Sequence, residues 1–359
     1  MKTANQIKIN NHELSGNSPT YFIADIAANH DGELQRAKDL IYLAKEAGAD
    51  CAKFQHFTAN KIVSNLGFEQ LGNLNTHQSG WKESVTKIYD HYHTRRDWTE
   101  ELVATCKEAD IEFMTTPYDL EAIDSFVNLV NAYKIGSGDI TYRRLIKRVV
   151  DTGKPIILAT GASDMKETVQ AVETILSKTP NLILLQCNTN YTGSVENFNY
   201  VNLNVLRTFQ KKWPNLITGL SDHTPGHSAV LGAVALGGRV IEKHFTDNNT
   251  RIGPDHEFAL NPSTWKEMVV RVRELERALG DGIKRVEKNE ENTRIVQRRA
   301  LRLNKNMNVG QIIEACDLIE LRPCPIDAIT PMDANYVVGM KLTVDKSRDE
   351  HLKWNDLNH

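Results

Sequence analysis

The chain has 359 residues, of which 40% are hydrophobic and 25% charged, a composition typical of a soluble globular protein. Its 43 basic and 46 acidic residues leave a formal net charge of −3, so no global field favours nucleic acid or a membrane surface as a partner. The first 21 residues lack the apolar core of a signal peptide, no run approaches a membrane span, and the five cysteines form no CxxC pair, so we expect a cytoplasmic protein with reduced thiols.

Short apolar runs alternate with helix-like patterns eight times along the chain. The expected strands cover residues 21–28, 51–57, 112–118, 132–138, 155–160, 182–188, 216–224 and 240–244. The expected helices cover residues 34–48, 97–109, 120–129, 142–152, 165–176, 202–213, 228–237 and 262–279. This alternation predicts a (β/α)8 TIM barrel over residues 1–280. A doubly wound open sheet is the alternative, but no GxGxxG motif follows the first strand.

Two stretches depart from the alternation. Residues 60–95 are long, polar and aromatic, and we expect them to cover the mouth of the barrel; their histidines, His77, His91 and His93, lack metal-ligand spacing and are interpreted as surface residues. Residues 281–297 are charged without apolar rhythm and predict a linker. Residues 298–359 carry short strand-like pieces and predict a small β-rich domain, which is marginal alone and is expected to pack on a partner surface.

Ionisable residues gather at the ends of two neighbouring predicted strands. Ser221, Asp222 and His223 end one strand, and Glu242, Lys243 and His244 end the next. Adjacent strands lie about 5 Å apart, so both imidazoles could reach one metal ion. A structural histidine with satisfied hydrogen bonds is the alternative for either one alone.

Polar side chains also end the other predicted strands, where the βα loops of a barrel build its site. The collected set is Asp25, Lys53, Gln55, Thr116, Lys134, Ser137, Asp139, Asn190, Tyr191, Ser221, His223, Glu242 and His244. Two lysines with several hydroxyls are typical of an anion-binding cradle. An anionic substrate beside a two-histidine metal site would suit addition to a carbonyl.

Seven motifs occur in order along the chain: ADIAANHDG, AKFQHF, AYKIGSGD, LATG, GLSDHT, VIEKHFT and RIGPDHEFALNP. Together they resemble the sialic acid synthase family, which includes the N-acetylneuraminate, legionaminic acid and pseudaminic acid synthases. The later segment RALRLNKNMNVGQIIEACDLIELRP is similar to that family's antifreeze-like (SAF) domain. The resemblance covers nearly the whole chain.

The resemblance implies condensation of phosphoenolpyruvate with an open-chain N-acyl hexosamine to give a nine-carbon 2-keto-3-deoxy acid and phosphate. It implies a divalent metal, typically Mn²⁺ with Mg²⁺ or Co²⁺ possible, on His223 and His244. It places Asp25 and Glu242 with them as catalytic residues. Phosphoenolpyruvate would contact Lys53, Thr116, Lys134, Ser137, Asn190 and Ser221. The sugar would contact Gln55, Asp139, Tyr191 and Asp255, and Arg322 from the partner subunit of a domain-swapped homodimer.

Four departures from the family pattern concern the sugar and phosphate contacts. Asp25 and Asp139 stand where the family commonly has glutamate, which shortens each side chain by roughly 1 Å and suggests a somewhat different sugar. Cys324 and Pro325 follow Arg322 and Pro323, where a glycine-containing turn is usual. The loop CNTNYTG is shifted, which leaves open whether its first or its second asparagine meets the phosphate.

Three other functions are alternatives. The octulosonate and heptulosonate phosphate synthases condense phosphoenolpyruvate with phosphorylated sugars, but they lack a SAF domain. A class I aldolase would use Lys243 as a Schiff base, yet strand alternation points this lysine away from the barrel interior. A non-catalytic carbohydrate-binding protein would have little use for so many ionisable groups.

Overall fold

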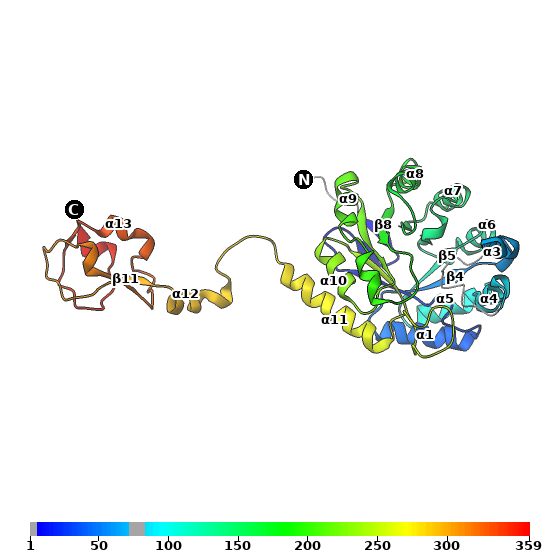
Figure 1. Cartoon of the computed structure of the whole chain (residues 1–359), viewed down its shortest axis with the longest axis horizontal. Coiled ribbons are helices and arrows are strands. Elements are labelled where there is room, and N and C mark those ends of the chain that lie inside the picture. The colour runs from blue at the N-terminus through cyan, green and yellow to red at the C-terminus, as the bar shows by residue number, and fades with distance from the viewer. Residues whose placement is uncertain (1–5, 72–82) are drawn as a thin grey trace. The chain divides into compact units, whose positions relative to one another are not determined.

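In the computed structural model, residues 6–71 and 83–359 of the chain are described. Their contacts divide the chain into two compact units, Met1–Gly280 and Asp281–His359, which we treat separately (Figure 1). Within the described residues, no helix combines the length and the hydropathy that crossing a membrane would require.

The first unit is built on a closed barrel of eight parallel strands. The strands are β3 (Tyr21–Asp25), β4 (Cys51–His56), β5 (Glu112–Pro117), β6 (Tyr133–Ile135), β7 (Ile156–Ala159), β8 (Leu182–Cys187), β9 (Ile217–Asp222) and β10 (Val240–His244). They pair in chain order, and β10 closes the ring by pairing with β3. The predicted (β/α)8 barrel is therefore confirmed.

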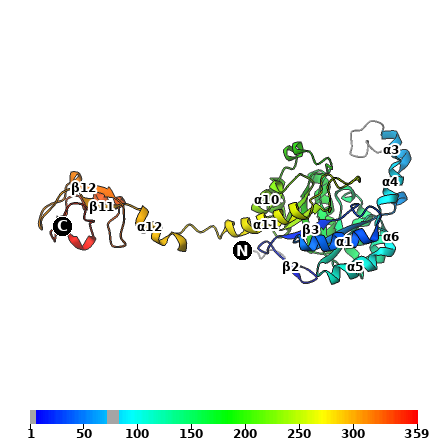
Figure 2. The ribbon, with the colours of Figure 1, turned by 90° about the horizontal axis from the view of Figure 1, so that it is seen from below.

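Helices surround the barrel on its outer side (Figures 1 and 2). They are α1 (Leu34–Glu46), α5 (Thr99–Glu108), α6 (Leu120–Phe126), α7 (Arg143–Asp151), α8 (Met165–Leu176), α9 (Val205–Lys212), α10 (Ser228–Ala235) and α11 (Pro262–Leu279). Most boundaries fall within a few residues of the predicted ones. The first strand ends at Asp25, earlier than expected, because Ala27 has a positive φ of 47° and starts the turn toward α1.

Side chains on each strand alternate between the barrel interior and the helices. On β8, Leu182 and Leu184 pack in the apolar layer beneath the helices, whereas Ile183 and Leu185 pack inside the barrel. The same alternation places Lys53, Lys134 and Glu242 inside. Polar residues at the inward positions of the strand ends therefore meet at one mouth.

The N-terminal residues form a hairpin that the sequence analysis did not anticipate. Strands β1 (Ile7–Ile9) and β2 (His12–Leu14) pair antiparallel. Ile7, Ile9 and Leu14 are buried in the same cluster as the inward residues at the strand beginnings, including Val240. The hairpin therefore covers the end of the barrel opposite the mouth.

The described residues of the long segment after β4 form the short helices α2 (Ala59–Ile62), α3 (Asn65–Leu71) and α4 (Val85–Tyr92). Ile62, Ile88 and Tyr92 line the cavity at the mouth, as expected for this segment. His77 falls outside the described residues.

The second unit is small and rich in short strands. It contains β11 (Ala300–Leu303) paired with β12 (Leu318–Leu321), β13 (Lys341–Leu342) paired with β14 (Leu357–Asn358), and the short helix α13 (Ala334–Val337). Its core includes Leu301, Ile313 and Leu352. Part of the predicted linker is instead the helix α12 (Glu291–Gln297), which joins this unit through a hydrogen bond from Cys324 N to Ile295 O. Assignment of this unit as a SAF domain stays a prediction.

Candidate active site

A cavity of about 400 Å³ lies at the C-terminal ends of the barrel strands. It brings together all the predicted site residues except Asn190 and Arg322. These are Asp25, Lys53, Gln55, Thr116, Lys134, Ser137, Asp139, Tyr191, Ser221, His223, Glu242, His244 and Asp255. Because they come from nearly every strand, the barrel itself determines their arrangement.

Lys53 and Asp25 form a buried ion pair on neighbouring strands, with 2.7 Å between Nζ and Oδ2. Lys53 also donates to Thr116 Oγ1 at 3.2 Å, and Gln55 Nε2 donates to Asp25 Oδ2 at 3.0 Å. Burial disfavours the ammonium, but Asp25 and Glu242 outweigh it and raise the pKa of Lys53. Lys53 is therefore a permanent cation within the barrel.

Lys134 and Glu242 form a second buried pair across the barrel, with 2.9 Å between Nζ and Oε1. Ser221 Oγ donates to the same oxygen at 2.9 Å, and Lys53 lies 4.0 Å from Oε2. Burial works against the carboxylate, yet Lys134 and Lys53 hold the pKa of Glu242 below its ordinary value. We call Asp25, Lys53, Thr116, Lys134, Ser221 and Glu242 the floor of the cavity.

The two predicted metal ligands face each other, with ring centroids 5.4 Å apart. His223 Nδ1 donates to Asn188 O at 3.0 Å, which leaves its Nε2 as the nitrogen with a lone pair. Burial lowers the pKa of His244, so this imidazole is neutral near pH 7. Its Nε2 lies 3.6 Å from Asp25 Oδ2, and its Nδ1 lies 3.7 Å from Asp255 Oδ2.

The residues present fit a divalent metal, although no complete ligand set is formed. Among residues 6–71 and 83–359, no three His, Cys, Asp or Glu side chains are already arranged as a metal site. However, His244 Nδ1, Asp25 Oδ1 and Glu242 Oε2 are buried without a hydrogen-bond partner in the described part of the chain. Two imidazoles beside carboxylates are ligands that Mn²⁺ accepts, with substrate or water completing the shell.

Two carboxylates lie at the sides of the cavity. Asp255 Oδ2 accepts a hydrogen bond from Ala28 N at 3.2 Å, which ties the loop after β10 to the turn after β3. Asp139 ends a short 3₁₀ turn (Ser137–Asp139), and its Oδ2 is buried without a partner among the described residues. Burial raises the pKa of Asp139 to about 6.

Cys187 and Thr189 line the cavity and were missed by the sequence analysis. Both lie close to Gly161: a Cβ at this glycine would stand 1.8 Å from Thr189 Oγ1 and 3.0 Å from Cys187 Sγ. Gly161 N donates to Ser137 Oγ at 2.9 Å. The inward positions of Ile183 and Leu185 on β8 could have revealed Cys187, two residues further along.

Asn190 does not line the cavity. Its Oδ1 accepts hydrogen bonds from Thr192 N at 3.1 Å and Thr192 Oγ1 at 2.7 Å, so the side chain closes a local turn on the exposed side of the loop. The expected contact of Asn190 with phosphoenolpyruvate is not formed by this arrangement of the loop and stays a prediction. Arg322 is an exposed residue of the second unit, and its expected contact with the sugar stays a prediction.

Lys243 is buried outside the cavity. Its Nζ donates to Asp222 Oδ2 at 2.6 Å, and it does not appear among the lining residues. A Schiff-base lysine must reach the substrate, so this placement argues against the class I aldolase.

Apolar and aromatic side chains surround the opening above the floor. We call this group the rim: Phe57, Ile62, Ile88, Tyr89, Tyr92 and Tyr118. They follow β4 and β5 or come from α2 and α4. Their loops and short helices have weak periodicity, which is why the sequence analysis placed only the segment and not its side chains.

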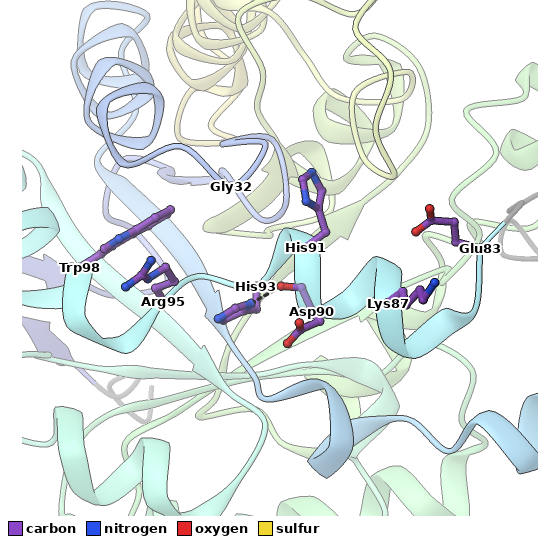
Figure 3. Close-up of a pocket in the computed structure, with 8 residues that line it drawn as sticks. All are labelled: Gly32, Glu83, Lys87, Asp90, His91, His93, Arg95 and Trp98. Atoms are coloured by element: carbon purple, nitrogen blue, oxygen red, sulfur yellow. Dashed lines mark hydrogen bonds between the residues drawn. The ribbon is translucent and has the colours of Figure 1, made fainter.

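His91 and His93, from the segment that covers the mouth, line a second and more open depression of about 440 Å³ (Figure 3). It is lined by Gly32, Glu83, Lys87, Asp90, His91, His93, Arg95 and Trp98. His93 Nδ1 donates to Asp90 O at 2.5 Å, and Arg95 lies over the Trp98 ring at 5.8 Å. His91 is exposed and His93 is half-buried, so neither belongs to the cavity at the barrel mouth.

Comparison with known proteins identifies the family to which the chain belongs. Residues 40–284 match the model of the NeuB family. The chain is 35% identical over 363 residues to N,N'-diacetyllegionaminic acid synthase of Legionella pneumophila, covering 97% of each protein. It is 34% identical to the enzyme of the same name from Campylobacter jejuni, covering 93% of this chain and 99% of that one. The crystal structure of N-acetylneuraminic acid (sialic acid) synthetase from Leptospira borgpetersenii matches with a TM-score of 0.71 and 26% identity, covering 81% of this chain and 95% of that one. The chain is therefore an enzyme of the NeuB family, to which the sialic acid synthases belong.

Proposed function

We propose that this enzyme condenses phosphoenolpyruvate with the open-chain form of an N-acyl hexosamine, giving a nine-carbon 2-keto-3-deoxy acid and phosphate. One observation carries the proposal: the floor, with two buried lysines, adjoins a facing pair of histidines within one cavity. The first arrangement suits a phosphorylated anion and the second suits a carbonyl oxygen. The similarity to legionaminic acid synthases supports the same reaction.

Phosphoenolpyruvate would bind on the floor. Lys53 and Lys134 supply fixed cations for its phosphate and carboxylate, while Thr116, Ser137 and Ser221 supply hydroxyl donors. Asp25 and Glu242 form ion pairs with the lysines before the substrate arrives. Thr189 lines the cavity, whereas Asn190 does not, so Thr189 would supply a further hydroxyl to the phosphate.

The sugar would place its aldehyde beside His223 and His244. A divalent cation such as Mn²⁺, held by these two side chains, would polarise the aldehyde oxygen. Gln55, Asp139, Tyr191 and Asp255 line the same cavity and would contact the sugar hydroxyls and amide.

In the proposed reaction two σ bonds to carbon form and one breaks, and the aldehyde oxygen takes up a proton to become a hydroxyl group. Carbon 3 of phosphoenolpyruvate bonds to carbon 1 of the sugar, and a water oxygen bonds to carbon 2. The tetrahedral intermediate then expels phosphate with the bridging C–O electron pair. Asp25 Oδ1 and Glu242 Oε2, without partners among the described residues, are the candidates to hold that water and accept its proton.

The composition of the rim favours an unphosphorylated sugar as the substrate. Among the described lining residues, Lys53 and Lys134 are the only lysine or arginine side chains, and both already bind carboxylates on the floor. A sugar phosphate would need a second set of cations. Aromatic and aliphatic rim side chains instead suit the acyl and deoxygenated carbons of a modified hexosamine.

We also propose that the second unit acts as a SAF domain in a domain-swapped homodimer, in which Arg322 of the partner contacts the acyl group. Support comes from the sequence resemblance and from the exposure of Arg322.

The test is phosphate release from phosphoenolpyruvate with Mn²⁺ and one of three acceptors: N-acetylmannosamine, a 2,4-diacetamido-2,4,6-trideoxyhexose or arabinose 5-phosphate. We expect release with one free hexosamine, loss of release in His244→Ala, and normal release in His91→Ala, a matched histidine outside the cavity. Release only with the phosphorylated pentose would refute the free-sugar substrate. No release with any amino sugar, despite sugar binding, would favour a carbohydrate-binding protein.

A further inference from the structure

A buried ion pair lies directly behind the two histidines, on the outer face of the barrel strands. Lys243 and Asp222 are cross-strand neighbours on β10 and β9, with 2.6 Å between Nζ and Oδ2. Each side chain is 1% exposed. Each also stands next in the chain to one histidine, Asp222 before His223 and Lys243 before His244.

The pair fixes the backbone on both sides of His223. Asp222 Oδ1 accepts hydrogen bonds from Thr224 N at 3.0 Å and Thr224 Oγ1 at 2.9 Å. Lys243 Nζ donates to Thr224 O at 2.6 Å in addition to Asp222. Lys243 of β10, the strand that carries His244, therefore bonds the side chain before His223 and the backbone carbonyl after it, while Asp222 itself bonds the amide of Thr224.

Stability alone is a weak explanation for this pair. The cost of removing two charges from water offsets most of their attraction, and apolar residues of similar volume often replace such pairs without loss. An apolar pair could not bond the amide and carbonyl of Thr224 at once. The arrangement is thus suited to setting geometry.

We propose that Lys243, through Asp222 and Thr224, is a positioning residue that fixes the separation of the His223 and His244 imidazoles. This inference rests on the proposed function, in which the two imidazoles together hold a divalent cation. Lys243 touches neither substrate nor cation in this role. Its hydrogen bonds hold the end of β9 in a fixed position relative to the end of β10.

The decisive variant is Asp222→Asn/Lys243→Met in the full chain, which removes the pair without leaving an unpaired buried charge. We expect the Kd for Mn²⁺, measured by electron paramagnetic resonance of free Mn²⁺, to rise roughly ten- to a hundred-fold. Phosphoenolpyruvate affinity without metal should change less than about three-fold, since the lysines of the floor are retained. Lys346→Met/Asp356→Asn, a pair of the same chemistry in the second unit with 2.6 Å between its charges, should leave both constants unchanged.

A crystal structure of the double variant gives a readout that does not depend on metal. We expect the imidazole centroids to depart from 5.4 Å or to become disordered. Retained imidazole geometry, or unchanged Mn²⁺ affinity in a folded variant, would overturn the proposal. If the unsubstituted enzyme binds phosphoenolpyruvate but not Mn²⁺, the metal part of the proposed function fails, and the crystal structure alone decides the positioning role.

Discussion

Replacing Asp139 by asparagine should stabilise the unliganded enzyme at neutral pH. The carboxyl is partly buried, one of its oxygens has no hydrogen-bond partner among the described residues, and burial raises its pKa to about 6. In the unfolded chain the group titrates near the ordinary value of 3.8. Above pH 6 the folded protein therefore holds an unfavourable charge that asparagine, of the same shape, does not carry.

The magnitude follows from the two pKa values. Their difference corresponds to about 3 kcal/mol of unfolding free energy. A raised folded-state pKa means that the folded protein binds more protons between pH 3.8 and 6, so the wild type loses stability as the pH rises through this window. The advantage of Asp139→Asn is thus absent below pH 3.8, roughly half developed at pH 5, and complete above pH 6.

The assay is urea unfolding at pH 5.0 and pH 7.5, followed by near-ultraviolet circular dichroism. We expect Asp139→Asn to gain up to about 3 kcal/mol at pH 7.5 and about half as much at pH 5.0. Asp151→Asn, an exposed aspartate at the end of α7, is the matched control and should change little. Equal gains at both pH values, or a loss at pH 7.5, would refute the reasoning.

Three further predictions concern the cavity. Gly161→Ala places a Cβ 1.8 Å from Thr189 Oγ1, so the Kd for phosphoenolpyruvate by calorimetry should rise at least about ten-fold; an unchanged Kd would contradict the close approach. Glu242→Gln leaves Lys134 without its buried carboxylate, so unfolding free energy should fall by roughly 3–5 kcal/mol, and phosphoenolpyruvate should restore part of it. A variant as stable as the wild type would show that the two lysines do not depend on this carboxylate. Removing metal with a chelator should abolish phosphate release and added Mn²⁺ should restore it; full turnover in the chelated enzyme would exclude a metal role.

The fold could be predicted from the hydrophobic periodicity of the sequence. Apolar runs of five to nine residues separated by amphipathic helices left few topologies, and the barrel followed from their number and order. The hairpin of β1 and β2 was missed because its strands have three residues each, and only Ile7, Ile9 and Leu14 mark its buried side. So short a pattern does not stand out from a polar terminus.

In the site, strand positions were predictable and loop positions were not. Lys53, Lys134 and Glu242 occupy inward positions that alternation alone assigns, and the barrel then brings them together. Asn190 comes three residues after β8, where hydrogen bonds to Thr192 determine its direction. Sequence spacing contains no information about that turn.

Side-chain partners on neighbouring strands also could not be predicted from the sequence. Alternation correctly pointed Lys243 away from the cavity, but its partner Asp222 depends on the register of β9 against β10. Register emerges only when the barrel closes.

The hairpin of β1 and β2 covers the end of the barrel opposite the cavity mouth. Ile7, Ile9 and Leu14 pack against the inward side chains there, so the described residues close that end and the cavity opens at the mouth. A sugar seated at the rim would then isolate the water left on the floor beside Asp25 and Glu242. The proposed reaction consumes one water per turnover. Three apolar residues that take no part in the chemistry would therefore limit the exchange of that water with bulk solvent.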